Sequence, residues 1–210
     1  MRIESLTAKP DRAGRFLIKF DDGSSMRIYR QTLEEFGLFT GMELSQDDMI
    51  RLREAAGEMS AKMRSVRIVA ASNVSKRDLE DRLVRKGERP DQAKKAVEWM
   101  SELDLVDDAR TAAQIVAQCV RKGYGLARAK QALYEKRIPK AYWEEALADY
   151  PDQSEHITVF LRSRLSEERD AAQVKRAVDA LLRRGHNYSD IRRCLKALDA
   201  EEFLEDSQWH

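Results

Sequence analysis

A helical unit of about 50 residues recurs along the chain and constrains its fold more than any other sequence feature. Shifting the sequence by about 50 residues places Leu83 on Leu133, and a further shift of about 48 residues places Leu133 on Leu181. Repeats of this length bury their apolar faces against neighbouring repeats. The pattern therefore predicts a curved, elongated array of three-helix repeats.

The middle unit shows the internal organisation of the repeat most clearly. Asp107 is a suitable N-cap for its first helix, and Gly123 and Gly125 supply the break that ends this helix. A second helix is predicted from Leu126, where apolar residues return at helical spacing. The third helix is expected to open at Pro139, since proline is favoured at a first helical position.

An N-terminal extension precedes the repeats. Apolar and polar residues alternate between Met1 and Arg30, and residues 21–24, Asp-Asp-Gly-Ser, are typical of a hairpin turn. The predicted fold is therefore mainly α, with a small antiparallel β extension of three strands. We place the extension at residues 1–44, the three repeats at residues 45–103, 104–151 and 152–200, and an acidic tail, expected to be frayed, at residues 201–210.

The first repeat has recognisable helix boundaries. Ser45 is predicted to cap its first helix, and Gly57 is a candidate break within that helix. Ser75 and Asp78 resemble a capping box at the start of the second helix, and Pro90 is expected to begin the third.

The middle unit also carries a family resemblance. Residues 104–139 read DLVDDARTAAQIVAQCVRKGYGLARAKQALYEKRIP. The Asp-Asp pair, the basic-Gly-x-Gly turn and the Leu-x-x-Lys-basic-Ile ending resemble the central module of the RecX family of recombinase regulators. Leu126 departs from that pattern, because a proline is common after the second glycine. The resemblance extends over most of the chain.

This resemblance implies a function and partners. A member of the family would be a regulatory protein without catalytic activity that binds the filament of the RecA recombinase on DNA. It would mostly inhibit recombination, ATP hydrolysis and coprotease activity, and so affect DNA repair and the SOS response. The implied partners are RecA and single-stranded DNA, with double-stranded DNA as a further candidate.

Charge is segregated along the chain, although the formal net charge is only +1. Residues 121–140 hold seven basic residues against one acidic residue, and residues 175–196 hold seven against two. Acidic residues gather elsewhere, above all in the tail. One molecule can therefore present a basic face to nucleic acid and an acidic face to a protein partner.

Each repeat is predicted to end its second helix with two adjacent basic residues. Equivalent positions of a solenoid lie along one face, so these pairs could form a stripe that binds a phosphate backbone. Alternatively, they only offset the helix dipole. With the basic and aromatic residues between positions 121 and 130, the candidate residues for binding nucleic acid and the RecA filament are Arg85, Lys86, Arg121, Lys122, Tyr124, Arg128, Lys130, Lys136, Arg137, Arg183 and Arg184.

Residues 121–125, Arg-Lys-Gly-Tyr-Gly, are predicted to form a mobile basic loop. Its Tyr124 could stack on a nucleobase. The competing interpretation is that the ring packs into the groove between helices, as aromatic side chains near helix junctions usually do.

The sequence holds no constellation typical of an enzyme. Asp107 and Asp108 are explained as an N-cap and an acidic first helical turn, and the three histidines are scattered. There is no Walker-type phosphate loop, nucleophile elbow or zinc signature. We therefore predict a protein without enzymatic activity, cofactor or metal.

Two cysteines and the hydropathy pattern bear on the cellular compartment. Cys119 and Cys194 stand beside apolar neighbours in helical patterns, so we expect reduced core residues rather than a disulfide. No apolar run approaches the roughly 20 residues that a membrane span requires, and the N-terminus lacks the apolar stretch of a signal peptide. We expect a cytoplasmic monomer that does not bind membranes.

Two other functional classes remain open from the residues alone. The first is a sequence-independent nucleic-acid-binding module of helical repeats that has no recombinase target. The second is a scaffold that binds only proteins. Salt discriminates between the nucleic-acid module and the recombinase regulator, because electrostatic binding to DNA weakens steeply as ionic strength rises, whereas docking into a protein groove is less affected. The protein-only scaffold predicts no DNA binding at any salt concentration.

Overall fold

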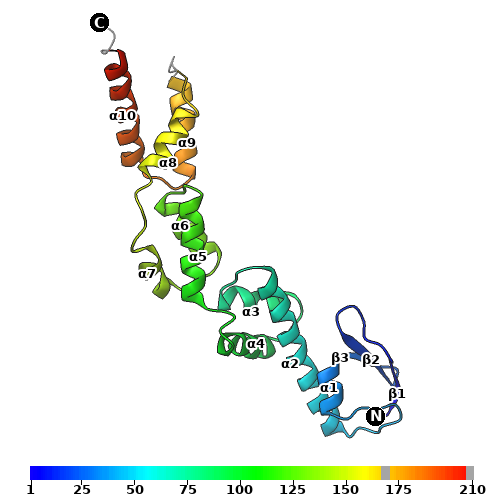
Figure 1. The fold of residues 1–210 in the computed structure, drawn as a ribbon. Coiled ribbons are helices and arrows are strands. Elements are labelled where there is room, and N and C mark those ends of the chain that lie inside the picture. The colour runs from blue at the N-terminus through cyan, green and yellow to red at the C-terminus, as the bar shows by residue number, and fades with distance from the viewer. Residues whose placement is uncertain (167–170, 207–210) are drawn as a thin grey trace. The chain divides into compact units, whose positions relative to one another are not determined.

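The structure, a computed structural model, describes residues 1–166 and 171–206 and divides into two compact units, Met1–Asp107 and Asp108–His210 (Figure 1). The described part of the chain forms ten α-helices, one short 3-10 helix and three β-strands. No helix within it is long and apolar enough to cross a membrane. The predicted mainly α fold with a small N-terminal antiparallel sheet is confirmed.

The sheet forms from the alternating segment at the N-terminus. Strands β1 (Ile3–Leu6), β2 (Arg15–Phe20) and β3 (Ser25–Tyr29) are antiparallel in the order β1-β2-β3, and residues 21–24 make the predicted turn. The apolar face of the sheet buries Ile18 and Ile28 against Leu52. A three-stranded sheet is marginal alone, so this packing on a helix stabilises it. The short helix α1 (Arg30–Glu35) follows β3.

Helix α2 (Gln46–Ala71) runs without interruption, so the predicted break at Gly57 is wrong. A Cβ atom added at Gly57 would lie 2.2 Å from Nε2 of the buried Gln92 on α4. The glycine therefore permits close packing of α2 against α4, rather than ending a helix. The N-terminal prediction is confirmed, because Ser45 and Asp48 form a reciprocal capping box.

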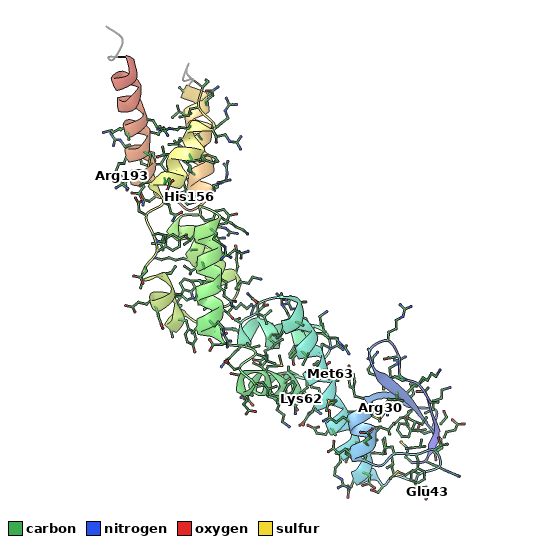
Figure 2. All side chains as sticks on the ribbon, in the orientation of Figure 1. Arg30, Glu43, Lys62, Met63, His156 and Arg193 are labelled. Carbon is green, nitrogen blue, oxygen red and sulfur yellow. The ribbon has the colours of Figure 1, made fainter. Side chains whose placement is uncertain are left out.

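Two further helices complete the first unit, α3 (Lys76–Arg85) and α4 (Pro90–Glu102). The side chain of Ser75 accepts a hydrogen bond from the Asp78 amide at 3.1 Å, and Pro90 occupies the first turn of α4, as predicted. Their core with α2 includes the fully buried Leu79 and Leu83. Lys62 of α2, labelled in Figure 2, places its ammonium 5.4 Å from the centre of the Trp99 ring on α4.

The second unit begins with helices α5 (Asp108–Arg121) and α6 (Leu126–Glu135). The predicted third helix starts later than expected, because Pro139 precedes a 3-10 helix (Lys140–Tyr142) and the short helix α7 (Trp143–Leu147). Apolar residues of α5, α6 and α7 form one cluster that includes Leu133 and Ile138.

Three helices follow in the same unit: α8 (Ser154–Arg162), α9 (Ala171–Arg183) and α10 (Tyr188–Asp206). They share a core that contains Ile157, Leu161 and Leu181. Helix α10 continues to Asp206, so the expected fraying from residue 201 is wrong as far as that residue, and the remainder of the predicted acidic tail lies outside the described residues. The repeat boundaries at residues 45, 104 and 152 stay a prediction.

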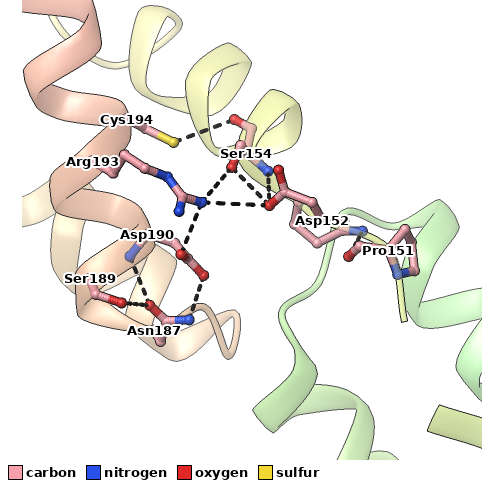
Figure 3. A network of polar contacts seen from close by, with 9 residues as sticks. Pro151, Asp152, Ser154, Asn187, Ser189, Asp190, Arg193 and Cys194 are labelled. Carbon is pink, nitrogen blue, oxygen red and sulfur yellow. Dashed lines mark hydrogen bonds and ion pairs between the residues drawn. The ribbon is translucent and has the colours of Figure 1, made fainter. Parts of the chain in front are cut away.

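A polar network fixes the start of α10 to the segment before α8 (Figure 3). The guanidinium of Arg193, also labelled in Figure 2, lies 3.1 Å from Ser154 Oγ, 3.1 Å from Asp190 and 3.8 Å from Asp152. Asn187 Oδ1 accepts a hydrogen bond from the Asp190 amide at 2.8 Å, which caps the first turn of α10. The network therefore holds α10 in place beside the start of α8.

Both cysteines are buried free thiols, as predicted. Burial raises the pKa of the Cys119 thiol, so this thiol has little thiolate character near neutral pH. Cys194 lies 3.6 Å from the Ser154 carbonyl oxygen, within the same region as the Arg193 network.

Candidate nucleic-acid and partner interface

The second helix of each predicted repeat, α3, α6 and α9, ends in the same backbone structure. Five residues after a buried leucine, an amide donates a hydrogen bond to the leucine carbonyl oxygen, which is the pattern of a Schellman motif. The donor–acceptor distances are 3.1 Å from Glu88 to Leu83, 3.0 Å from Ile138 to Leu133, and 3.2 Å from His186 to Leu181. The three helix ends are therefore structurally equivalent.

The shared helix end allows the positions of the predicted basic pairs to be compared between repeats. Lys86, Lys136 and Arg184 occupy the same position, three residues after the buried leucine. The next position has a left-handed backbone in all three repeats, with φ of 91° at Gly87, 55° at Arg137 and 85° at Gly185. The central pair is thus displaced by one residue and places an arginine where the other repeats have glycine, the residue that tolerates this conformation best.

The first basic pair is exposed at the end of α3. The Arg85 guanidinium is 4.0 Å from the Asp78 carboxylate, and its Nε donates to the Asp81 carbonyl oxygen at 3.2 Å. Lys86 is the C-cap residue. This pair lies in the first compact unit, and the other candidates lie in the second. A common stripe through all three pairs stays a prediction.

In the second unit, the loop between α5 and α6 is held against the turn between α9 and α10. The Gly125 amide donates to the Arg184 carbonyl oxygen at 2.9 Å, and the Ala127 amide donates to that of Gly185 at 3.2 Å. The hydroxyl of Tyr150 donates to the Tyr124 carbonyl oxygen at 2.7 Å. The expectation of a mobile loop is therefore wrong, because long-range hydrogen bonds fix its backbone.

Glycines allow the two turns to approach. A Cβ atom at Gly125 would lie 2.0 Å from the Gly185 carbonyl oxygen, and one at Gly185 would lie 2.2 Å from the Arg128 nitrogen. Only residues without a side chain can make this contact. We name the contact between residues 123–128 and 184–186 the glycine junction. It brings Arg128 next to the turn that carries Arg184, and Arg121 and Lys122 directly precede it.

A buried histidine completes the glycine junction. His186 Nε2 lies 3.0 Å from the Gly123 carbonyl oxygen, and burial lowers the pKa of its imidazole. A ring that stays neutral donates one hydrogen bond to this carbonyl without a charge that must be desolvated. Nearby, burial raises the pKa of Tyr150 to about 12, so its hydroxyl remains a donor.

The remaining candidate residues differ in their exposure and in the side chains that they contact. Arg128 forms an ion pair with Glu135 at 2.9 Å, which raises the pKa of the arginine and lowers that of the carboxylate. Lys130 is exposed on α6, Lys136 is half-buried and Arg137 is exposed. The Arg184 guanidinium covers the Phe160 ring at 4.7 Å from its centre.

Sequence reasoning missed two arginines beside Arg183. Arg164, Arg176 and Arg183 line a cavity of about 600 Å³ beside α8 and α9, and Phe160 lines it as well. Arg176 falls in the basic segment 175–196, so local charge density was the available signal. Arg164 falls in the predicted first helix of the repeat but lies in the turn after α8, and only the fold brings this turn beside α9.

An exposed tyrosine was also missed. Tyr124, the predicted aromatic contact, is half-buried, which favours the packing interpretation of its ring. Tyr134 on α6 is 73% exposed, more than any other large hydrophobic or aromatic side chain in the described residues. Its position one helical turn after Lys130 was the signal that could have identified it.

Comparison with known proteins places these features in a family. A model described as RecX, second three-helix domain, matches residues 107–147. A Regulatory protein RecX from Vibrio cholerae serotype O1 is 30% identical over 149 residues, which cover 66% of this chain and 93% of the relative. The chain belongs to the RecX family. A second relative, the Regulatory protein RecX from Clostridium acetobutylicum, is 23% identical over 209 residues and aligns with 95% of this chain and 96% of its own length.

Solved RecX structures share the fold. A crystal structure of regulatory protein RecX superposes with a TM-score of 0.65 at 17% identity and covers 93% of this chain and 98% of its own. The RecX from Lactobacillus salivarius superposes with a TM-score of 0.61 at 20% identity over 70% of this chain and 99% of its own. The second three-helix domain of RecX corresponds here to α5–α7, which carry most of the candidate residues.

Proposed function

We propose that this RecX-family protein binds the RecA filament on DNA and mostly inhibits its recombination, ATP hydrolysis and coprotease activities. It would act in the cytoplasm and thereby restrain DNA repair and the SOS response, without catalytic activity of its own. The observation that carries the proposal is the matched second three-helix domain, which presents Lys130, Lys136 and Arg137 on and after α6.

The charges of this domain suit a partner that includes a phosphate backbone. Lysine and arginine side chains neutralise phosphates and release counterions whatever the base sequence, as a regulator of a filament on arbitrary DNA requires. The glycine junction supports the same proposal. Its hydrogen bonds hold the second predicted repeat against the third. Because this part of the protein is already ordered before it binds, less conformational entropy is lost on binding and more of the interaction energy appears as affinity.

The test is DNA-dependent ATP hydrolysis by the cognate RecA, measured on single-stranded DNA while this protein is titrated in. A Lys136→Glu, Arg137→Glu double variant reverses two charges of the candidate interface. A Lys19→Glu, Lys94→Glu variant is the matched control, since both lysines are exposed, lie outside the candidate set and give the same change in net charge.

We expect inhibition well below one molecule per RecA protomer, weakened in the interface variant and unchanged in the control. If the interface variant inhibits RecA as strongly as the control variant, Lys136 and Arg137 do not belong to the interface. If the protein binds DNA but leaves ATP hydrolysis unchanged at several-fold excess, the regulator proposal is refuted and a general nucleic-acid-binding module is the better description.

A further inference from the structure

The most exposed aromatic ring of the described residues is flanked in sequence by two cationic residues. Tyr134 is 73% exposed in the last turn of α6. Lys130 stands one helical turn earlier, so both side chains project from the same face, and Arg137 follows directly after the C-cap residue. We name Lys130, Tyr134 and Arg137 the α6 triad.

The other two repeats provide an internal comparison. Their helix ends have the same Schellman geometry, so positions can be matched from the buried leucine. The matched residues are Glu80, Val84 and Gly87 in the first repeat and Val178, Leu182 and Gly185 in the third. The combination of cation, aromatic ring and cation thus occurs only in the middle repeat, so the repeat fold does not require it.

The backbone of Arg137 adds a second, independent observation. Its φ of 55° is the left-handed conformation that glycine adopts at the matched positions of the other repeats. A residue with a side chain is less stable in this conformation than glycine. Backbone strain of this kind clusters at functional sites, although Asp104 in the first unit has the same conformation with a φ of 56°. The arginine at this position therefore adds support to a binding role for the triad without carrying it alone.

We propose that the α6 triad binds single-stranded nucleic acid, with one unpaired base stacked on the Tyr134 ring and the flanking phosphates held by Lys130 and Arg137. An exposed ring between cations matches this ligand, because every base has a π-face and every linkage carries a charge. A duplex keeps its base faces stacked, so the ring selects single strands. The inference deepens the proposed function, since it names the DNA contact of the same domain.

The test uses the full-length protein and a fluorescently labelled oligothymidylate, with binding followed by anisotropy at constant low salt. Tyr134→Leu introduces the residue that the third repeat has at this position, and circular dichroism confirms that the exposed site still folds. We expect the dissociation constant to rise about 5- to 150-fold, the range for loss of one stacked base. Tyr134→Phe keeps the ring and should retain affinity.

Tyr188→Leu is the matched control, because Tyr188 is 60% exposed and lies at the start of α10, outside the triad. Its affinity for oligothymidylate should be unchanged. Lys130→Gln and Arg137→Gly should each reduce the dependence of log affinity on log salt by somewhat less than one unit, as expected for one lost phosphate contact on a single strand.

An abasic strand of the same length tests stacking itself. The wild-type protein should bind it about as weakly as Tyr134→Leu binds oligothymidylate, and Tyr134→Leu should cause no further loss. Equal loss on both strands, unchanged binding in Tyr134→Leu or no binding of oligothymidylate by the wild type would each overturn the inference. If Tyr134→Leu weakens only the inhibition of RecA, the ring contacts protein, and the proposed function stands without the stacking site.

Discussion

Replacing Gly125 by alanine tests the role of the glycine junction. The backbone of Gly125 has φ −77° and ψ 165°, which alanine adopts readily, so the substitution adds no backbone strain. Its new Cβ would lie 2.0 Å from the Gly185 carbonyl oxygen and 2.4 Å from the His186 nitrogen. Both atoms belong to backbone, so the two turns must separate by more than about 1 Å to restore normal contact.

The expected loss can be built from two contributions. Overpacking of a tight contact costs about 1–3 kcal/mol. Separation of the turns also breaks the 2.9 Å hydrogen bond from the Gly125 amide to Arg184, which contributes about 0.5–1.5 kcal/mol. We therefore expect the free energy of unfolding of the second unit to fall by about 1.5–4.5 kcal/mol.

Gly125→Ser separates steric overlap from helix capping. Gly125 is the N-cap residue of α6, where serine is a good cap and alanine a poor one. If overlap dominates, both variants should lose a similar amount of stability in urea denaturation. Hydrogen exchange of the His186 amide should accelerate in both. A stability within about 0.5 kcal/mol of wild type for Gly125→Ala, or full recovery in Gly125→Ser, would refute the reasoning.

Two further predictions concern buried ionisable groups. Burial lowers the pKa of His186 below 6.5, so unfolding takes up a proton and stability should decline as the pH falls from about 6.5 toward the folded-state pKa. Urea denaturation at several pH values across this range should show the decline in stability. The same decline in His186→Asn would contradict its assignment to His186. The buried Glu88 accepts from Arg64 at 2.7 Å and Ser60 at 2.9 Å, so Glu88→Ala should cost about 1–3 kcal/mol in thermal or urea unfolding. The control Glu98→Ala on the exposed face of α4 should cause no measurable change; equal effects of the two variants would refute the burial argument.

Local signals in the sequence were sufficient for most elements of the fold. Alternation of apolar and polar residues predicted the sheet. The predicted caps at Ser45 and Ser75 both accept a hydrogen bond from an amide of the first helical turn. Gly57 shows the limit of such signals. A glycine inside a helical pattern can end the helix or admit a neighbour, and the side chain that decides, Gln92, is 35 positions away in sequence.

The same limit applies to the candidate site. Charge spacing placed the basic residues at helix ends, but it could not show that Arg128 is paired with Glu135 or that Arg184 covers Phe160. The two tyrosines of the central repeat illustrate the physical reason. Tyr124 is half-buried in a loop held by contacts with residues 150 and 184, whereas Tyr134 faces solvent, and burial depends on partners remote in sequence.

Arg137 allows strain and function to be separated in one position. Both Arg137→Gly and Arg137→Ala remove the guanidinium and its contacts, but only glycine relieves the left-handed backbone. The glycine variant should therefore be more stable than the alanine variant by about 1 kcal/mol in urea denaturation, while both inhibit RecA less than wild type. Gly87→Ala is the reciprocal control, since its φ is 91° and an added Cβ has no neighbour within 4 Å, so any loss reports backbone strain alone. Equal stabilities of the two Arg137 variants would show that the position is unstrained. Undiminished inhibition would show that natural selection did not retain this arginine for binding, and the argument from strain to function would fail at this helix end.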